Sequence, residues 1–114
     1  MAEDCLFCNM VSGKFPVEKL YDQGDVFAIR DINPRAPIHI LVIPYEHIAT
    51  VSDLTTAHGD LLANIFQGAN VVARQEGLAE QGYRCTFNVG ADGGQTIDHI
   101  HMHVLGGRKL GAEG

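Results

Sequence analysis

The sequence predicts an α+β fold in which one antiparallel sheet of five strands packs beside one long helix and a short N-terminal helix. Three observations support this: a hairpin pattern near the N-terminus, a single amphipathic stretch ending at residue 76, and strand-like segments on both sides of it. Helices do not alternate with strands, so an antiparallel sheet is favoured over a parallel one. With 114 residues, we expect a single domain over residues 1–114.

The residue pattern of the N-terminal half predicts the short helix and three strands. Apolar residues at positions 6, 7, 10 and 11 indicate a helix that Gly13 closes. Strands are expected at 17–22 and 26–31, because a short polar connection containing glycine separates them. The β-branched run 38–43 ends at a proline and predicts a third, mostly buried strand.

The residue pattern of the C-terminal half predicts the long helix and two more strands. From about residue 53 or 56 to 76, apolar residues recur at helical spacing, and Gly77 follows at the position of a C-terminal cap. Gly68 lies inside this helix, at a cost of ~1 kcal/mol relative to alanine. Strands at 83–89 and 97–105 follow, separated by a glycine-rich loop.

Composition and charge exclude several classes of function. Eight Lys and Arg against fourteen Asp and Glu give a net charge of −6, and no basic stripe is present, so we expect no polymeric nucleic acid as partner. The longest apolar run, 38–44, is far shorter than the ~20 residues of a membrane span, so no membrane association is expected. The acidic residues 1–4 do not resemble a signal peptide, which predicts a cytoplasmic location without structural disulfides among the three cysteines.

Three of the six histidines alternate with apolar residues in His99-Ile100-His101-Met102-His103-Val104. On a strand, the three imidazoles would share one face and the apolar residues would fill the other. Same-face positions lie ~6.7 Å apart, so one metal ion cannot easily bind all three rings. Asn88 and the segment 93–96 supply glycines, amides and a hydroxyl, which are neutral groups suited to cradling a phosphate.

The segment from Asn88 to Arg108, with Gly93-Gly94-Gln95 ahead of the three histidines, resembles the signature of histidine triad (HIT) proteins. It is most similar to the Hint branch of purine nucleoside phosphoramidases. The resemblance extends upstream through 27–44 and so covers nearly the whole chain.

The resemblance implies a homodimeric α+β enzyme that binds a purine nucleotide and cleaves a bond at its α-phosphorus, releasing AMP or GMP. His101 would be the nucleophile and would form a nucleotidyl-histidine intermediate, while its other ring nitrogen donates to a backbone carbonyl. His103, His39, Gln95 and Thr96 would contact the phosphate or the leaving group and help to protonate the departing amine.

The resemblance also implies nucleotide-binding positions. Asn88 and the backbone amides from Gly94 to Thr96 would stabilise the transition state, and Asp31 would accept hydrogen bonds from the ribose. The positions that match the wall of the base site are Leu6, Phe7, Met10, Phe15, Ile29 and Ile32. Each of these apolar residues is equally well explained as part of the core.

A second group of residues predicts a metal site. Cys5, Cys8, His47 and His99 offer two sulfurs and two nitrogens, which suit a closed tetrahedral zinc site with a structural role. The alternative is a reduced Cys-x-x-Cys pair that binds nothing. His58, near the start of the long helix, is expected to be exposed and without a role.

Three departures from the family pattern leave the preferred leaving group open. Thr96 stands where serine is frequent, Asp98 stands where an aromatic residue is common, and the segment after Arg108 lacks the longer or tryptophan-bearing tail of some relatives. Three alternatives to phosphoramidate hydrolysis therefore stay open: hydrolysis of dinucleoside polyphosphates, a nucleotide-binding scaffold dimer with little turnover, and a catalytic zinc hydrolase that uses His101 and His103.

Overall fold

The computed structural model describes residues 5–113, so the acidic segment 1–4 and the residue at 114 lie outside the described residues. Short helix α1 precedes two strands, and the long helix α2 follows the third. The elements are α1 (Leu6–Val11), β1 (Tyr21–Gln23), β2 (Val26–Arg30), β3 (Ile38–Pro44), α2 (Gly59–Gln75), β4 (Arg84–Thr86) and β5 (Met102–Gly106), with two 3-10 turns, Val51–Asp53 and Thr56–His58, ahead of α2.

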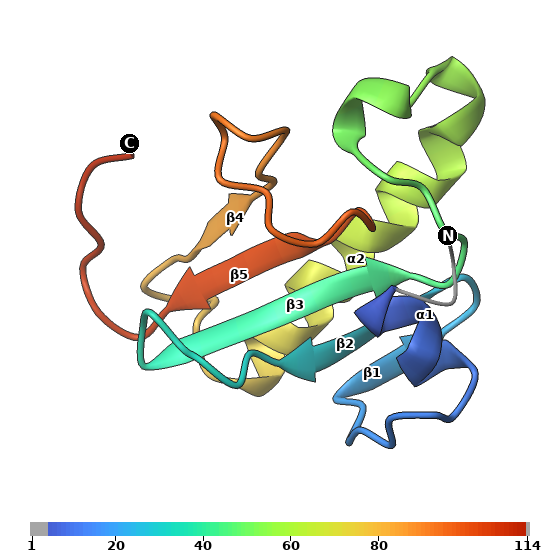
Figure 1. Cartoon of the computed structure of the whole chain (residues 1–114). Coiled ribbons are helices and arrows are strands. Elements are labelled where there is room, and N and C mark those ends of the chain that lie inside the picture. The colour runs from blue at the N-terminus through green and yellow to red at the C-terminus, as the bar shows by residue number, and fades with distance from the viewer. Residues whose placement is uncertain (1–4, 114) are drawn as a thin grey trace.

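The strands form one antiparallel sheet in the order β1-β2-β3-β5-β4 (Figure 1), which confirms the predicted α+β class. β3 and β5 lie side by side in the sheet, with Leu41 opposite His103 and His39 opposite Leu105. Within residues 5–113 no helix is both long and apolar enough to cross a membrane.

The two faces of the sheet are covered differently. The long helix α2 packs on one face and buries alternate strand residues such as Val42, Met102 and Val104. The short helix α1 packs on the opposite face, where Cys5 and Phe7 join Phe27, Leu41 and Ile43 in a second apolar cluster. Because strand side chains alternate, His39 and His103 also belong to the α1 face.

Gly68 lies inside α2 at a point where the helix packs closely against the sheet. A Cβ atom at this position would lie 3.1 Å from a ring carbon of Tyr21 and 3.3 Å from Cγ1 of Val42. The glycine therefore lets the helix approach the sheet closely, an advantage that helix propensity alone does not reveal.

Element boundaries differ from the sequence prediction mainly before β5. The strand predicted over 97–105 begins only at Met102, because the preceding backbone is bonded elsewhere: Ile100 N–H donates to the Ile48 carbonyl at 2.7 Å, and the His99 carbonyl lies 2.8 Å from Nδ1 of His101. The strands predicted at 17–22 and 83–89 are also shorter, and α2 begins at Gly59 after the 3-10 turns.

The prediction for His58 was wrong. Its side chain is half-buried, and Nδ1 accepts a hydrogen bond from the Thr55 backbone N–H at 2.9 Å while the Thr55 hydroxyl accepts from Ala57 N–H. His58 therefore completes a capping box at the start of the helical segment.

Candidate active site and metal centre

A cavity of about 460 Å³ lies on the α1 face of the sheet and has an apolar part and a polar part. Its volume is in the range of small-molecule sites. The apolar lining consists of Leu6, Phe7, Met10, Ile29, Ile32, Leu41 and Ile97. The polar lining consists of Arg30, Asp31, Asn33, Arg35, Asn88, Gly94, Thr96, His101 and His103. The arrangement suits a ligand with a flat apolar group at one end and an anionic group at the other.

His101 presents one ring nitrogen to this cavity. Its Nδ1–H donates to the His99 carbonyl at 2.8 Å, which leaves Nε2 unprotonated on the neutral ring. Burial lowers the pKa of His101, so the imidazole is neutral at pH 7. The ring of Phe7 packs edge-on against it, with centroids 5.0 Å apart, and fixes its orientation. A fixed, neutral imidazole is suited to act as a nucleophile.

His39 and His103 form a hydrogen-bonded chain that starts at the backbone. Arg35 N–H donates to Nδ1 of His39 at 3.1 Å, so His39 carries its proton on Nε2. That Nε2–H lies 2.9 Å from Nδ1 of His103 and donates to it, which places the His103 proton on its own Nε2. Burial is the main cause that lowers the pKa of His103 to about 4, with added contributions from His101, His39 and Arg35. His103 is therefore a neutral hydrogen-bond donor at the cavity.

Asp31, His39 and His103 bring ligand-type atoms within 4.8 Å of one another, and these three groups could in principle hold a metal ion. Two nitrogens bound to one tetrahedral zinc would lie about 3.3 Å apart. The 2.9 Å separation of the two histidine nitrogens is shorter than that and is instead a hydrogen-bond distance.

The loop before β5 is braced by two amide side chains. Gln95 donates from Nε2 to the carbonyls of Ala49 at 2.7 Å and Ile97 at 3.0 Å, and its Oε1 accepts from Gly90 N–H. Asn88 donates from Nδ2 to the Gly93 carbonyl at 2.7 Å. A Cβ atom on Gly93 would lie 2.3 Å from the backbone oxygen of Val89, so this tight loop requires a glycine there.

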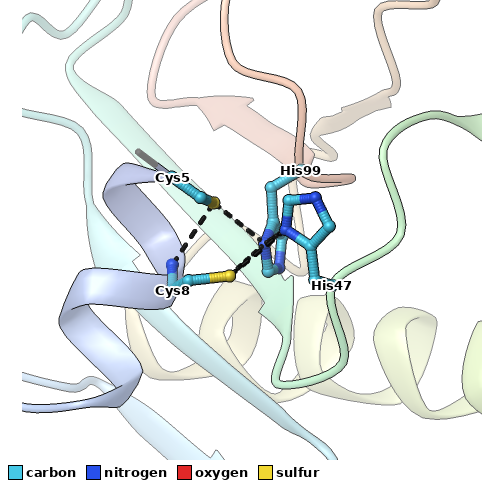
Figure 2. A group of neighbouring side chains, drawn as sticks. All are labelled: Cys5, Cys8, His47 and His99. Carbon is cyan, nitrogen blue, oxygen red and sulfur yellow. Dashed lines mark hydrogen bonds between the residues drawn. The ribbon is translucent and has the colours of Figure 1, made fainter. Parts of the chain in front are cut away.

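Four side chains from three separate parts of the chain meet beside α1. Figure 2 shows Cys5 and Cys8 on one side and His47 and His99 on the other, all pointing toward a common centre. Cys5 Sγ also accepts from Cys8 N–H at 3.3 Å and so caps α1. His99 Nε2–H donates to the Pro44 carbonyl at 2.9 Å, which leaves Nδ1 unprotonated and aimed at the two sulfurs.

The distances within this group are close to the edge lengths of a tetrahedral metal site, although two of them are slightly shorter. Nδ1 of His99 lies 3.2 Å from Nδ1 of His47, 3.3 Å from Cys5 Sγ and 3.5 Å from Cys8 Sγ, while Cys8 Sγ lies 3.2 Å from Nδ1 of His47. Ordinary zinc–ligand bond lengths predict edges of about 3.3 to 3.8 Å. The cluster can therefore hold a metal ion, and its donors are those that zinc prefers.

Most of the predicted site residues meet in these two places, but three do not line the cavity. Gln95 braces the loop, His39 lies behind His103, and Phe15 is 49% exposed elsewhere. Arg35 was not predicted from the sequence: its side chain lines the cavity, and its backbone N–H orients His39. Its position between two prolines gave no signal for either contact.

Comparison with known proteins identifies the family of the chain. The family model for the HIT domain matches residues 12–110. The purine nucleoside phosphoramidase of Escherichia coli K12 is 45% identical over 111 residues, which span 97% of this chain and 93% of that protein. The chain therefore belongs to the HIT domain family, and it is a hydrolase of that family.

Solved structures extend the comparison. A HIT family hydrolase from Legionella pneumophila superposes with a TM-score of 0.91 at 46% identity, covering 95% of this chain and 96% of the other. A zinc-bound histidine triad protein from Mycobacterium smegmatis superposes with a TM-score of 0.78 at 33% identity, covering 95% of this chain and 78% of the other.

Proposed function

We propose that the protein hydrolyses purine nucleoside phosphoramidates, or related nucleotidyl conjugates, through a nucleotidyl-histidine intermediate and releases AMP or GMP. One observation carries the proposal: His101 donates its Nδ1 proton to a backbone carbonyl and holds an unprotonated Nε2 at the cavity. The similarity to a purine nucleoside phosphoramidase supports the choice of substrate.

In the first half of the reaction, the lone pair on His101 Nε2 attacks the α-phosphorus and a P–N bond to the ring forms. The substrate P–N bond breaks, and the leaving nitrogen keeps its electron pair and takes one proton from solvent, while the neutral His103 ring donates a hydrogen bond to it. In the second half, water attacks the phosphorus and gives up one proton to solvent, and the bond to His101 breaks with its electron pair returning to Nε2. The products are the free amine and the nucleoside monophosphate.

The remaining polar groups would act on the phosphoryl oxygens and the sugar. Thr96, Asn88 and the backbone near Gly94 line the cavity beside the two histidines and offer neutral donors to the developing charge. Asp31 would accept hydrogen bonds from the ribose hydroxyls, since its carboxylate lines the same cavity. His39 and Gln95 act as positioning residues, through His103 and through the loop respectively.

The purine would occupy the apolar part of the cavity. Phe7 and Ile29 are buried walls, with exposed fractions of 1% and 5%, whereas Ile32 is 90% exposed and would be covered by the bound base. A flat aromatic ring recovers apolar burial on both of its faces in such a site.

We also propose that Cys5, Cys8, His47 and His99 hold one zinc ion. Four protein ligands leave no position for water, so zinc would supply structural cross-linking of α1 to the sheet and not hydrolysis. Free thiols in this cluster fit a reducing compartment, which supports a cytoplasmic location.

A homodimer is part of the proposal. β4 is an edge strand of the sheet, and its unpaired backbone groups could be covered by a second copy. Light scattering should give a mass near twice 12.4 kDa, and a mass of one chain would contradict the dimer.

The decisive experiment is turnover of adenosine 5′-phosphoramidate by the purified protein, with His101→Ala beside it and a chelator control. AMP should be released, the variant should lose at least about 10³-fold in kcat/KM, and chelation should leave kcat largely unchanged even though it weakens nucleotide binding. During turnover, alkaline quenching and intact-mass measurement should find a nucleotidyl adduct on the wild-type chain and none on the variant.

Two other outcomes would replace the proposal. Binding of AMP without release above the level of His101→Ala would favour a nucleotide-binding scaffold. Loss of activity upon chelation, with the fold retained, would favour a catalytic zinc hydrolase. A parallel assay with a dinucleoside polyphosphate tests the remaining alternative, because faster turnover of that substrate would change the substrate class.

A further inference from the structure

A second pocket of about 270 Å³ adjoins the active-site cavity on the other side of His103. Three residues line both spaces: Arg35, Asn88 and His103. The rest of the second pocket is built by β4, β5 and the segment 108–113 that follows β5. The two pockets are therefore continuous through His103, the histidine that we assign to a hydrogen bond with the leaving group.

The second pocket concentrates positive charge in an acidic protein. Arg35, Arg84 and Arg108 line it, and Glu113 is its one carboxylate, although the whole chain has a net charge of −6. Within residues 5–113, neither Arg35 nor Arg108 has a carboxylate at ion-pair distance. Such a pocket attracts anions whatever the net charge of the protein.

The guanidinium groups are held in place by backbone and ring contacts. Arg84 donates to the Gly111 carbonyl at 2.6 Å, and Arg108 donates to the Arg35 carbonyl at 3.1 Å. Nη2 of Arg35 lies 3.4 Å from Nδ1 of His103. These contacts leave further N–H donors on each guanidinium, and a planar group with several donors recognises carboxylate and phosphate oxygens.

A carboxylate of the chain itself already lies at this pocket. Oε2 of Glu113 is 3.2 Å from Nη2 of Arg84, and its side chain is 81% exposed. An exposed ion pair of this kind is weak, so an incoming anion can displace it. The contact identifies the chemistry that the pocket accommodates.

The position of the second pocket relative to His101 indicates which part of a substrate would enter it. Nucleophile and leaving group lie roughly in line across phosphorus in phosphoryl transfer, so the leaving group points away from His101. In the proposed function the first cavity would hold the base, the ribose and the phosphorus, and the second pocket continues beyond His103.

We propose that this second pocket is a leaving-group subsite that selects amines carrying an anionic group, either a carboxylate or a phosphate. The inference rests on the proposed phosphoramidate hydrolysis. Arg84 and Arg108 would bind the anionic group, and Arg35 would bridge it and the phosphoryl group.

The test compares substrates that differ only in charge at the far end of the leaving amine. Adenosine 5′-phosphoramidates of glycine and glycinamide form the carboxylate pair, and those of 2-aminoethyl phosphate and ethanolamine form the phosphate pair. We expect kcat/KM to favour the anionic member by about tenfold, and the pair with the larger ratio identifies the preferred anion. The ratio should fall as salt is raised to 1 M.

Arginine variants test whether the preference for anionic leaving groups arises in the second pocket. The double variant Arg84→Gln with Arg108→Gln should bring the ratio close to one, whereas Arg84→Lys with Arg108→Lys should keep most of it. Arg74→Gln is the matched control, because it removes one exposed positive charge on α2, outside both pockets, and should leave the ratio unchanged.

Equal turnover of anionic and neutral members by the wild type would overturn the subsite, as would a ratio that the double Gln variant retains. Unsubstituted adenosine 5′-phosphoramidate separates the two proposals, because its ammonia leaving group cannot reach the second pocket. Failure to hydrolyse that compound contradicts the proposed function, whereas its hydrolysis without any charge preference contradicts the subsite alone.

Discussion

The three alternating histidines have three different environments, and the partner of each ring decides its chemistry. Nδ1 of His99 faces the cysteines, and Nδ1–H of His101 donates to a backbone carbonyl. Nδ1 of His103 accepts a hydrogen bond from His39. Burial lowers the pKa of all three rings. All three imidazoles are therefore neutral, and the hydrogen-bond partner of each ring fixes its tautomer.

The low pKa of His103 predicts an acid dependence of stability. In the unfolded chain its pKa is near 6.5, whereas in the folded protein it is about 4. Between these values the unfolded state binds a proton that the native state does not, so the free energy of unfolding falls as pH falls. The fall should amount to roughly 2–3 kcal/mol between pH 6.5 and 4.

Urea denaturation of metal-free wild type and His103→Gln across this pH range measures the effect. The variant lacks the titrating ring, so its stability should fall less steeply with acid than that of the wild type. Parallel curves for the two proteins would show that His103 does not carry the low pKa.

Among the secondary-structure elements, the contact of α2 with the sheet depends on Gly68. Alanine gains up to about 1 kcal/mol over glycine inside a helix, but here its methyl group would press on Tyr21 and on buried Val42. We therefore expect Gly68→Ala to give no net stabilisation.

Gly59→Ala is the matched control, because nothing lies within 4 Å of a Cβ atom at that helical position. It should raise the free energy of unfolding by about 0.4–1 kcal/mol, measured by urea denaturation. Equal gains for the two variants would mean that the close approach at Gly68 has no energetic consequence.

Across the whole molecule, the metal cluster and the active-site cavity are coupled through α1. Cys5 and Cys8 bracket Leu6 and Phe7, which line the cavity, and Phe7 packs against both His99 and His101. Fixing α1 to the sheet therefore also fixes one wall of the proposed base site.

Removal of the proposed zinc should lower Tm by about 5 °C or more and weaken AMP binding, because α1 loses its anchor. Metal analysis should find one zinc per chain in the wild type and in Cys85→Ser, whose thiol lies on β4 outside the cluster, but little zinc in Cys8→Ser. Equal zinc content in both cysteine variants would contradict the assigned ligands.

The sequence by itself determined the α+β class and the burial of the apolar residues that alternate with the histidines, Ile100, Met102 and Val104, which lie in the core cluster with α2. Periodicity and turn residues are local signals, so they can be read without coordinates. The triad and the glycine-rich loop were recognisable for the same reason, since their residues are contiguous in the chain.

Only the tertiary structure determined the contacts between residues that are far apart in the sequence. The approach of Cys5 to a histidine 94 positions away supports the predicted metal cluster, but the distances that test it exist only in the fold. The roles of Gln95 and His39 depend on backbone groups outside the strands, namely the carbonyls of Ala49 and Ile97 and the N–H of Arg35. Three arginines far apart in sequence form a pocket because β3, β5 and β4 are neighbours, a long-range arrangement without any local pattern.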